Sequence, residues 1–178
     1  MKYFDELKRA MEWLGAKPDT VFVGQAVADP GTGMSKTLST IDKLKLMELP
    51  VAEEFQLGLS LGMALNGSIP ISIFPRWNFL LLATNQLINH LDKARILSHG
   101  EYKPKVIIRT AIGSERPLHP QIQHVGDFTA AYRLMLKTVE VVRLEEPEQI
   151  MDAYRIAYER PDHKSTILVE YGDYYNEK

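Results

Sequence analysis

The sequence predicts an α/β fold, a doubly wound and mainly parallel sheet with helices on both faces. Two observations support this prediction. Short apolar runs alternate along the chain with longer segments in which apolar residues recur every three or four positions, so strands and helices are expected in alternation. The helical segments are long enough to return the chain across a sheet, which favours parallel strands joined by right-handed crossovers and covered on both faces.

The first half of the chain opens with a helix, because Phe4, Leu7, Met11 and Leu14 share one face and Gly15 is a stop signal. The elements expected after it are a strand at 21–23 ending at Gly24, a Gly- and Pro-rich loop at 29–33, a weak helix at 37–44, a helix entered at Pro50 and running to residue 65, a buried strand at 69–74 and a long helix at 78–97.

The second half continues the alternation. The expected elements are a buried strand at 105–110, a polar loop at 111–126, a helix at 127–136, a strand at 139–143, a helix at 147–158 and a last strand at 166–170. In open parallel sheets, ligands bind beyond the carboxyl ends of the strands. We therefore expect a site in the loops that follow Gly24, Phe74 and Thr110.

Composition sets limits on the kind of protein. The 178 residues, 45% of them apolar, suit one core, and we expect a single domain over residues 1–178. The net charge of −2, with dispersed Lys and Arg, argues against a nucleic-acid partner. With no cysteine, disulfides, thiolate metal sites and a cysteine nucleophile are excluded. Neither a secretory signal nor a bilayer span is evident, so we expect a cytoplasmic protein.

Several familiar motifs fail on their spacing. The segment GTGMSKT at 31–37 has the composition of a phosphate loop, but Ser35 stands where the Walker motif needs Gly. Lys36 likewise occupies the third glycine position of the dinucleotide fingerprint. His119 and His124 are five positions apart in a loop, without the Glu of a zinc-binding helix, and no G-x-S-x-G is present. The chain by itself is therefore expected to bind no metal.

Glu53 lies where an apolar helix begins, directly after Pro50-Val51-Ala52. Two interpretations are open from this pattern alone. An acid in the first helical turn is favoured by the helix dipole, and Glu54 beside it fits that structural role. Alternatively, Glu53 is a desolvated carboxylate in a site. Phe79 has a similar pair of interpretations, as a core aromatic or as a ligand contact.

Five segments of the chain form an ordered set of motifs. They are Pro50-Val51-Ala52-Glu53 with a helix carrying Gly58, Gly62 and Gly67, then Trp77-Asn78-Phe79, Asn85-Gln86-Leu87-Ile88-Asn89, Arg109-Thr110 and Gln123-His124. In this order and register, residues 21–170 resemble the thiamine-pyrimidine-binding domain of the transketolase superfamily. The resemblance is specifically to the N-terminal half of the β subunit of 2-oxo acid dehydrogenase decarboxylase components, although Asn85 replaces the family's Asp.

The resemblance implies a role for each matched residue. Val51, Glu53 and Phe79 would bind thiamine diphosphate, with Glu53 sharing a proton with the pyrimidine ring and Phe79 stacking on its face. Burial raises the pKa of a carboxyl group, which would ease that proton transfer. Glu53 and His124 would be the catalytic residues, His124 by moving protons near the substrate. The loop at 115–120 replaces a glycine-rich loop of the family, so a solvated histidine is the alternative for His124.

The family's diphosphate-binding half has no counterpart in this sequence. That half holds magnesium through a G-D-G motif followed by Asn, and Gly172-Asp173-Tyr174 lacks the second Gly. The resemblance therefore implies a partner subunit that carries G-D-G…N and binds the magnesium, in a hetero-oligomer with two copies of each chain. Asn85, Gln86, Asn89 and His90 suit the subunit contact. Gln25 is a further departure, because the family usually has an acid there.

The function implied is that of the pyrimidine-side subunit of a split enzyme, inactive alone. The enzyme would decarboxylate a 2-oxo acid and transfer the resulting carbanion to lipoamide, an aldehyde or a proton. One alternative is transfer of a two-carbon ketol unit between sugars, as in split transketolases. The other is a non-catalytic scaffold or regulatory paralogue.

Overall fold

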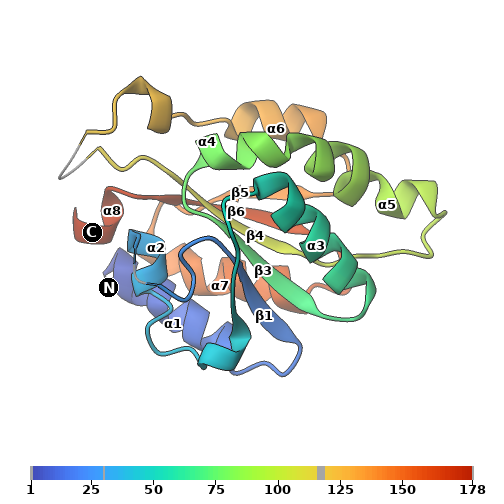
Figure 1. The fold of residues 1–178 in the computed structure, drawn as a ribbon, viewed down its shortest axis with the longest axis horizontal. Helices are drawn as coiled ribbons and strands as arrows, with labels where there is room; N and C mark the ends of the chain where they lie inside the picture. Colours follow the sequence, from blue (N-terminus) through green and yellow to red (C-terminus); the bar gives the residue numbers. More distant parts are fainter. Residues whose placement is uncertain (1, 30, 116–118, 178) are drawn as a thin grey trace.

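A six-stranded, entirely parallel sheet forms the centre of the protein (Figure 1). The structure is a computed structural model that describes residues 2–29, 31–115 and 119–177. The strands are β1 (Thr20–Gly24), β2 (Leu46–Glu48), β3 (Ile69–Phe74), β4 (Ile107–Ile112), β5 (Glu140–Arg143) and β6 (Thr166–Tyr171). Their spatial order is β2-β1-β3-β4-β6-β5, with every neighbouring pair parallel. The predicted α/β fold class is confirmed.

Helices cover both faces of the sheet. One face carries α1 (Tyr3–Gly15), α2 (Gly33–Lys36), α7 (Pro147–Glu159) and α8 (Tyr174–Glu177); the other carries α3 (Glu53–Leu65), α4 (Trp77–Leu80), α5 (Asp92–Leu97) and α6 (Thr129–Met135) (Figure 1). Two apolar clusters fill the two layers, and consecutive residues of β4 belong to different clusters, Ile107 to one and Ile108 to the other. The near-continuous apolar strands of the sequence follow from this two-sided burial.

The weak helix expected at 37–44 is wrong. The helix of this region is α2, which ends at Lys36 after starting beside Thr32, whose hydroxyl accepts the backbone N–H of Ser35. Thr37 is fully buried, and its hydroxyl bonds the Met34 carbonyl, so the chain turns here instead of continuing as a helix. A 3-10 turn at Lys43–Lys45 and the short edge strand β2 follow, and the sequence reading missed both.

The segment expected as one helix at 78–97 is helical throughout most of its length but changes its hydrogen-bonding pattern. It consists of α4, a 3-10 turn at Leu81–Ala83, a π-helix at Gln86–Leu91 and α5. Within the described part of the chain, no helix is both long enough and apolar enough to cross a bilayer. This helical segment matters for the site because its first part, α4, begins directly after the carboxyl end of β3.

Candidate functional site

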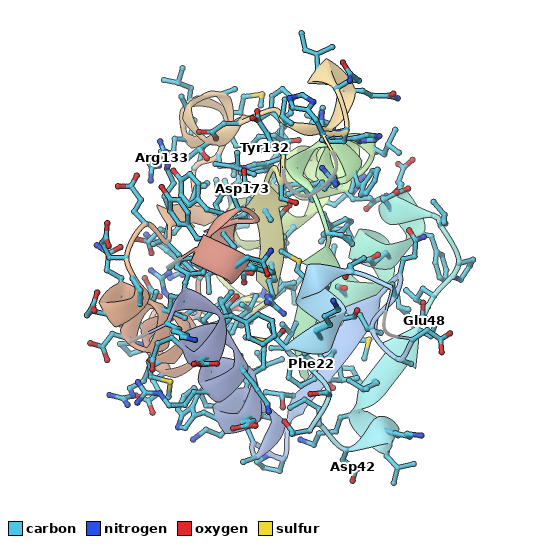
Figure 2. The ribbon with its side chains drawn as sticks, turned by 90° about the vertical axis from the view of Figure 1, so that its left-hand side faces the viewer. Phe22, Asp42, Glu48, Tyr132, Arg133 and Asp173 are labelled. Atoms are coloured by element: carbon cyan, nitrogen blue, oxygen red, sulfur yellow. The ribbon has the colours of Figure 1, made fainter. Side chains whose placement is uncertain are left out.

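The predicted site residues lie at the carboxyl edge of the sheet. In Figure 2 this edge faces the reader, with Asp173 and Tyr132 in its upper middle part and Glu48 towards one side. The chain from β2 enters α3 here at Glu53, and the chain from β3 enters α4 here and reaches Phe79. A 3-10 turn at Ile122–His124 packs against α4 and brings His124 to the same edge.

Glu53 is the first residue of α3 and is only 9% exposed. No side chain caps this helix, since Ala52 is the N-cap residue. Among the described residues, none donates a hydrogen bond to the Glu53 carboxylate, whereas the neighbouring Glu54 is exposed and accepts one from Asn85 Nδ2 at 3.1 Å. Glu53 is thus a largely buried acid with its acceptor atoms available to a ligand, stabilised by the helix N-terminus.

The start of α3 is held rigidly against the sheet. The buried Gln56 side chain donates from Nε2 to the Ile73 carbonyl at 2.9 Å and to Ser72 Oγ at 3.1 Å. Gly24 permits this close approach, because a Cβ there would lie 2.5 Å from the Ile73 carbonyl oxygen and 3.2 Å from Gln56 Nε2. One turn before Gln56, Glu53 therefore has a fixed position.

Phe79 and His124 contact each other. Their ring centroids are 5.4 Å apart with an interplanar angle of 61°, an edge-on arrangement, and both side chains are half-buried. His124 Nδ1 is buried and has no hydrogen-bond partner among the described residues. The structure therefore packs His124 into the edge of the sheet with this ring nitrogen unpaired within the described residues. Residues 116–118 of the loop that precedes it lie outside the described residues.

Val51 and Gln25 belong to two other segments at the carboxyl ends of the strands, the turn before α3 and the loop after β1. Val51 is 66% exposed in the turn that precedes α3. Gln25 is half-buried after β1, and the following loop is closed by Glu48, which accepts the backbone N–H groups of Val27 and Ala28 at 2.8 Å. A carboxylate from β2 is thus present in the loop where Gln25 replaces the expected acid.

Arg76 was not singled out by sequence reasoning, yet it lines a cavity of about 260 Å³ at the same edge. The other lining residues are Gly31, Thr32, Gly33, Met34, Pro75, Ala111, Gly113, Ser114, Gly172 and Tyr175. Arg76 Nη1 donates to the His124 carbonyl at 3.0 Å, which ties the cavity to the His124 turn. Burial lowers the pKa of Arg76, and the charge of Asp173 opposes this shift only in part.

A buried ion pair supports the floor of the cavity. Arg109 on β4 and Glu170 on β6 are both completely buried and form a two-pronged salt bridge. Arg109 Nη1 also donates to Thr37 Oγ1 at 2.8 Å, and the Tyr154 and Tyr175 hydroxyls donate to Glu170. Burial by itself would lower the pKa of Arg109, but the charge and hydrogen bond of Glu170, together with Tyr154 and Tyr175, raise that pKa above its ordinary value. Burial, reinforced by Glu170, raises the pKa of both tyrosines.

A buried acid at the start of α3 and a contacting aromatic–histidine pair in α4 and the Ile122–His124 turn all lie at the carboxyl edge of the sheet. The same residues offer few ligands for a metal ion. In residues 2–29, 31–115 and 119–177, no cluster of three or more His, Asp or Glu side chains is arranged to hold a metal ion.

Comparison with known proteins identifies relatives. A family model described as "Transketolase, pyrimidine binding domain" matches residues 1–176. The chain is 32% identical over 130 residues to the pyruvate dehydrogenase E1 component subunit beta, mitochondrial, of Ascaris suum, covering 71% of this chain and 36% of that protein. It is 27% identical over 136 residues to the 2-oxoisovalerate dehydrogenase subunit beta of Bacillus subtilis (strain 168), covering 74% and 41%. The chain thus spans less than half the length of these curated relatives.

A solved structure shares the fold. The protein described as "Split gene transketolase, inactive beta4 tetramer" matches with a TM-score of 0.69, covering 94% of this chain and 50% of that one. The sequence identity is 16%, so this similarity concerns the fold alone.

Proposed function

The chain belongs to the transketolase pyrimidine-binding domain family, and on this basis we propose that it is the pyrimidine-side subunit of a split thiamine diphosphate-dependent enzyme. The enzyme would decarboxylate a 2-oxo acid and transfer the remaining fragment to an acceptor. The observation that carries this proposal is the buried Glu53 carboxylate, which has no hydrogen-bond donor among the described residues and starts α3 at the same edge of the sheet as the Phe79–His124 pair.

Thiamine diphosphate, when bound, supplies a nucleophilic carbon that adds to a carbonyl and stabilises the negative charge left by decarboxylation. Glu53 would hydrogen-bond and share a proton with the aminopyrimidine ring. A carboxylate surrounded by protein serves this purpose because the ring's donor does not have to compete with water. Gln56 fixes the helix that carries Glu53, so the acid needs little reorganisation on binding.

Phe79 would fix the plane of the pyrimidine ring, because the aromatic face is apolar and the side chain is already held by the His124 ring. His124 would hold or deliver a proton at the substrate end of the site through its unpartnered Nδ1. Val51, exposed immediately before α3, would contribute an apolar contact at the ring's margin.

The proposal requires a second chain that binds the diphosphate and the magnesium ion through a G-D-G…N motif, in an assembly with two copies of each subunit. The surface of α3 and the adjoining helical segment supports a partner contact there. Phe55 and Leu82 are 57% and 63% exposed, and exposed Asn85 and Asn89 are hydrogen-bonded to each other at 3.0 Å. Such a mixture of apolar and hydrogen-bonded polar groups is typical of subunit interfaces.

The test begins with co-purification from the native host to obtain the partner chain. In the reconstituted enzyme, Glu53→Gln should reduce turnover by a factor of at least about 100 while leaving assembly intact, because it removes the shared proton. Glu54→Gln is the matched control and should retain nearly full activity, since Glu54 is exposed and bonded to Asn85. Equal activity of the wild type and the Glu53→Gln enzyme would contradict the proposal.

Two alternatives give different results in the same experiment. Transfer of a ketol unit between sugars is suggested by the fold similarity to a split-gene transketolase. It predicts that the Glu53-dependent turnover uses a ketose donor and not a 2-oxo acid. A scaffold or regulatory paralogue predicts that the Glu53→Gln change affects neither turnover nor assembly.

A further inference from the structure

The cavity that contains Arg76 is separate from the proposed pyrimidine contacts but adjoins them. Its walls come from α2, from the loops after β3 and β4, and from the segment 172–175 after β6. None of Val51, Glu53 or Phe79 lines it, while Arg76 reaches the His124 turn by the hydrogen bond to the His124 carbonyl. The cavity therefore adjoins the His124 turn, against which the Phe79 ring also packs.

Arg76 retains most of its hydrogen-bonding capacity. A guanidinium has five N–H donors, and the structure assigns one interaction of Arg76 within the described chain, from Nη1 to the His124 carbonyl. No ion pair joins Arg76 to a carboxylate of the described residues. By contrast, Arg109, Arg143 and Arg160 all have carboxylate partners within 4.0 Å. Arg76 is thus a half-buried cation that lines a cavity and, within the described residues, forms no ion pair.

The nearest opposing charge is held by other contacts. The carboxylate of Asp173 accepts the backbone N–H of Glu115, at 3.0 Å and 3.2 Å for its two oxygens. Asp173 influences Arg76 through space, and this charge would repel an incoming anion. An anion bound by Arg76 would therefore be held by the guanidinium against a modest repulsion.

The rest of the wall leaves room for a small group. A Cβ at Gly172 would lie 2.8 Å from the Ser114 nitrogen, and a Cβ at Gly33 would lie 2.9 Å from the Tyr175 ring. Glycine at these two positions lets the segments approach closely around the cavity. A volume of about 260 Å³ corresponds to roughly eight or nine water molecules, given about 30 Å³ for each in the liquid. That space suits a short organic acid or the phosphorylated end of a sugar.

We propose that Arg76 is a specificity-determining residue that binds the anionic end of the substrate, a carboxylate or a phosphate monoester, in this cavity. The guanidinium fork matches two oxygens of either group. The inference rests on the proposed function, because it assigns the substrate of that same site. Binding of the anion by Arg76 requires no cofactor, so the inference can be tested separately from the proposed function.

The experiment titrates the isolated chain with pyruvate and, separately, with inorganic phosphate, while the backbone N–H signals of Gly113 and Gly172 are followed by NMR. Methyl pyruvate, which has no charge, is the control ligand. Arg76→Gln should weaken binding of the anion by about tenfold or more, and Arg76→Lys by less, because Lys keeps the charge but not the fork. Asp173→Asn should strengthen binding. Arg155→Gln is the matched control, since Arg155 is a surface residue paired with Asp152.

Selective binding of pyruvate assigns a 2-oxo acid, and selective binding of phosphate assigns a phosphorylated substrate; both outcomes support the inference. Equal binding to the wild type and to the Arg76→Gln variant overturns it, as does the absence of binding by either anion at millimolar concentration. The Glu53→Gln variant should bind the anion like the wild type. Anion binding that persists when the Glu53 experiment fails would refute the cofactor role and leave the Arg76 site standing.

Discussion

At the scale of single residues, Glu170 is a fully buried carboxylate with three side-chain donors. Arg109, Tyr154 and Tyr175 all donate to its fully buried carboxylate. Glu170→Gln leaves the Arg109 guanidinium buried without a counter-charge, and we expect the free energy of unfolding to fall by about 3–5 kcal/mol. Urea unfolding followed by circular dichroism measures this change.

The control for this prediction is a surface ion pair. The Asp152 side chain is 71% exposed and pairs with Arg155 at 3.5 Å, so Asp152→Asn should change the free energy of unfolding by less than about 0.5 kcal/mol. A loss at Glu170 no greater than the loss at Asp152 would contradict the account of the buried pair.

Asp162 gives a prediction about pH. Hydrogen bonds from Arg160 lower the pKa of Asp162 from 3.8 to about 2. A carboxyl group with a lowered pKa in the folded state contributes stability above its unfolded value, and this contribution is lost as the pH falls through about 2. The side chain is 38% exposed, so the contribution is screened and should stay below about 1 kcal/mol.

The measurement is an NMR titration of the Asp162 side-chain carboxyl carbon. Its midpoint should lie near 2 in the wild type and should move back towards 3.8 in Arg160→Gln. A wild-type midpoint at or above 3.8 would show that the pairing with Arg160 is absent in solution.

At the scale of elements, apolar spacing predicted the buried strands best. The strand at 69–74 was predicted with its observed bounds, because its apolar residues, interrupted only by Ser72, are flanked by Ser68 and Pro75. The hydrogen-bonding pattern within a helical segment could not be predicted in the same way. Nothing in the amino-acid composition of the π-helix at Gln86–Leu91 distinguishes it from an α-helix. Gln86 packs over Gly58 of α3, and this contact exists only in the folded protein.

The failed helix at 37–44 has a similar cause. The sequence predicted Thr37 as the first residue of a weak helix, but its hydroxyl lies in the core and accepts a hydrogen bond from Arg109. This contact joins residues 72 positions apart, so local spacing in the sequence gives no sign of it. The edge strand β2 is only three residues long, too short to produce a recognisable alternation.

Asp92 links two elements of the same layer. It begins α5, is 1% exposed, and accepts the backbone N–H groups of Lys137, Thr138 and Val139 at 2.7–2.9 Å. Asp92→Ala would leave these donors unsatisfied, so we expect a loss of about 2–4 kcal/mol, with a smaller loss in Asp92→Asn, which retains one acceptor oxygen. Hydrogen exchange should accelerate at 137–139. Unchanged exchange there in Asp92→Ala would contradict this role.

At the scale of the whole molecule, the sequence identified the residues that carry motifs but not the cavity beside them. Glu53, Phe79 and His124 belong to short segments whose order along the chain is informative. Arg76 has no comparable signal, because its importance depends on four segments that converge only in the folded sheet. Their convergence at one edge follows from the parallel topology, which brings the carboxyl ends of all strands together.

The distribution of exposed apolar side chains predicts which layer faces a partner. Phe55 on α3 and Ile156 on α7 are 57% and 61% exposed, but they lie on opposite faces of the sheet. Phe55→Gln should weaken association with the co-purified partner by about tenfold or more, because a desolvated aromatic anchor is lost. Ile156→Gln should change that affinity by less than about twofold. Sedimentation velocity measures both, and an equal effect at the two positions would exclude α3 from the interface.

The two ends of the described chain lie close together, because the Tyr3 and Tyr174 rings are 5.5 Å apart and α1 packs beside α8 (Figure 1). A short peptide linker could therefore join them, with new ends opened at Gly100 in the surface turn after α5, on the opposite side of the sheet. Such a circular permutant would carry a fluorescent label or an affinity handle far from the Arg76 cavity. It would allow ligand binding and subunit association to be measured with the label far from the cavity.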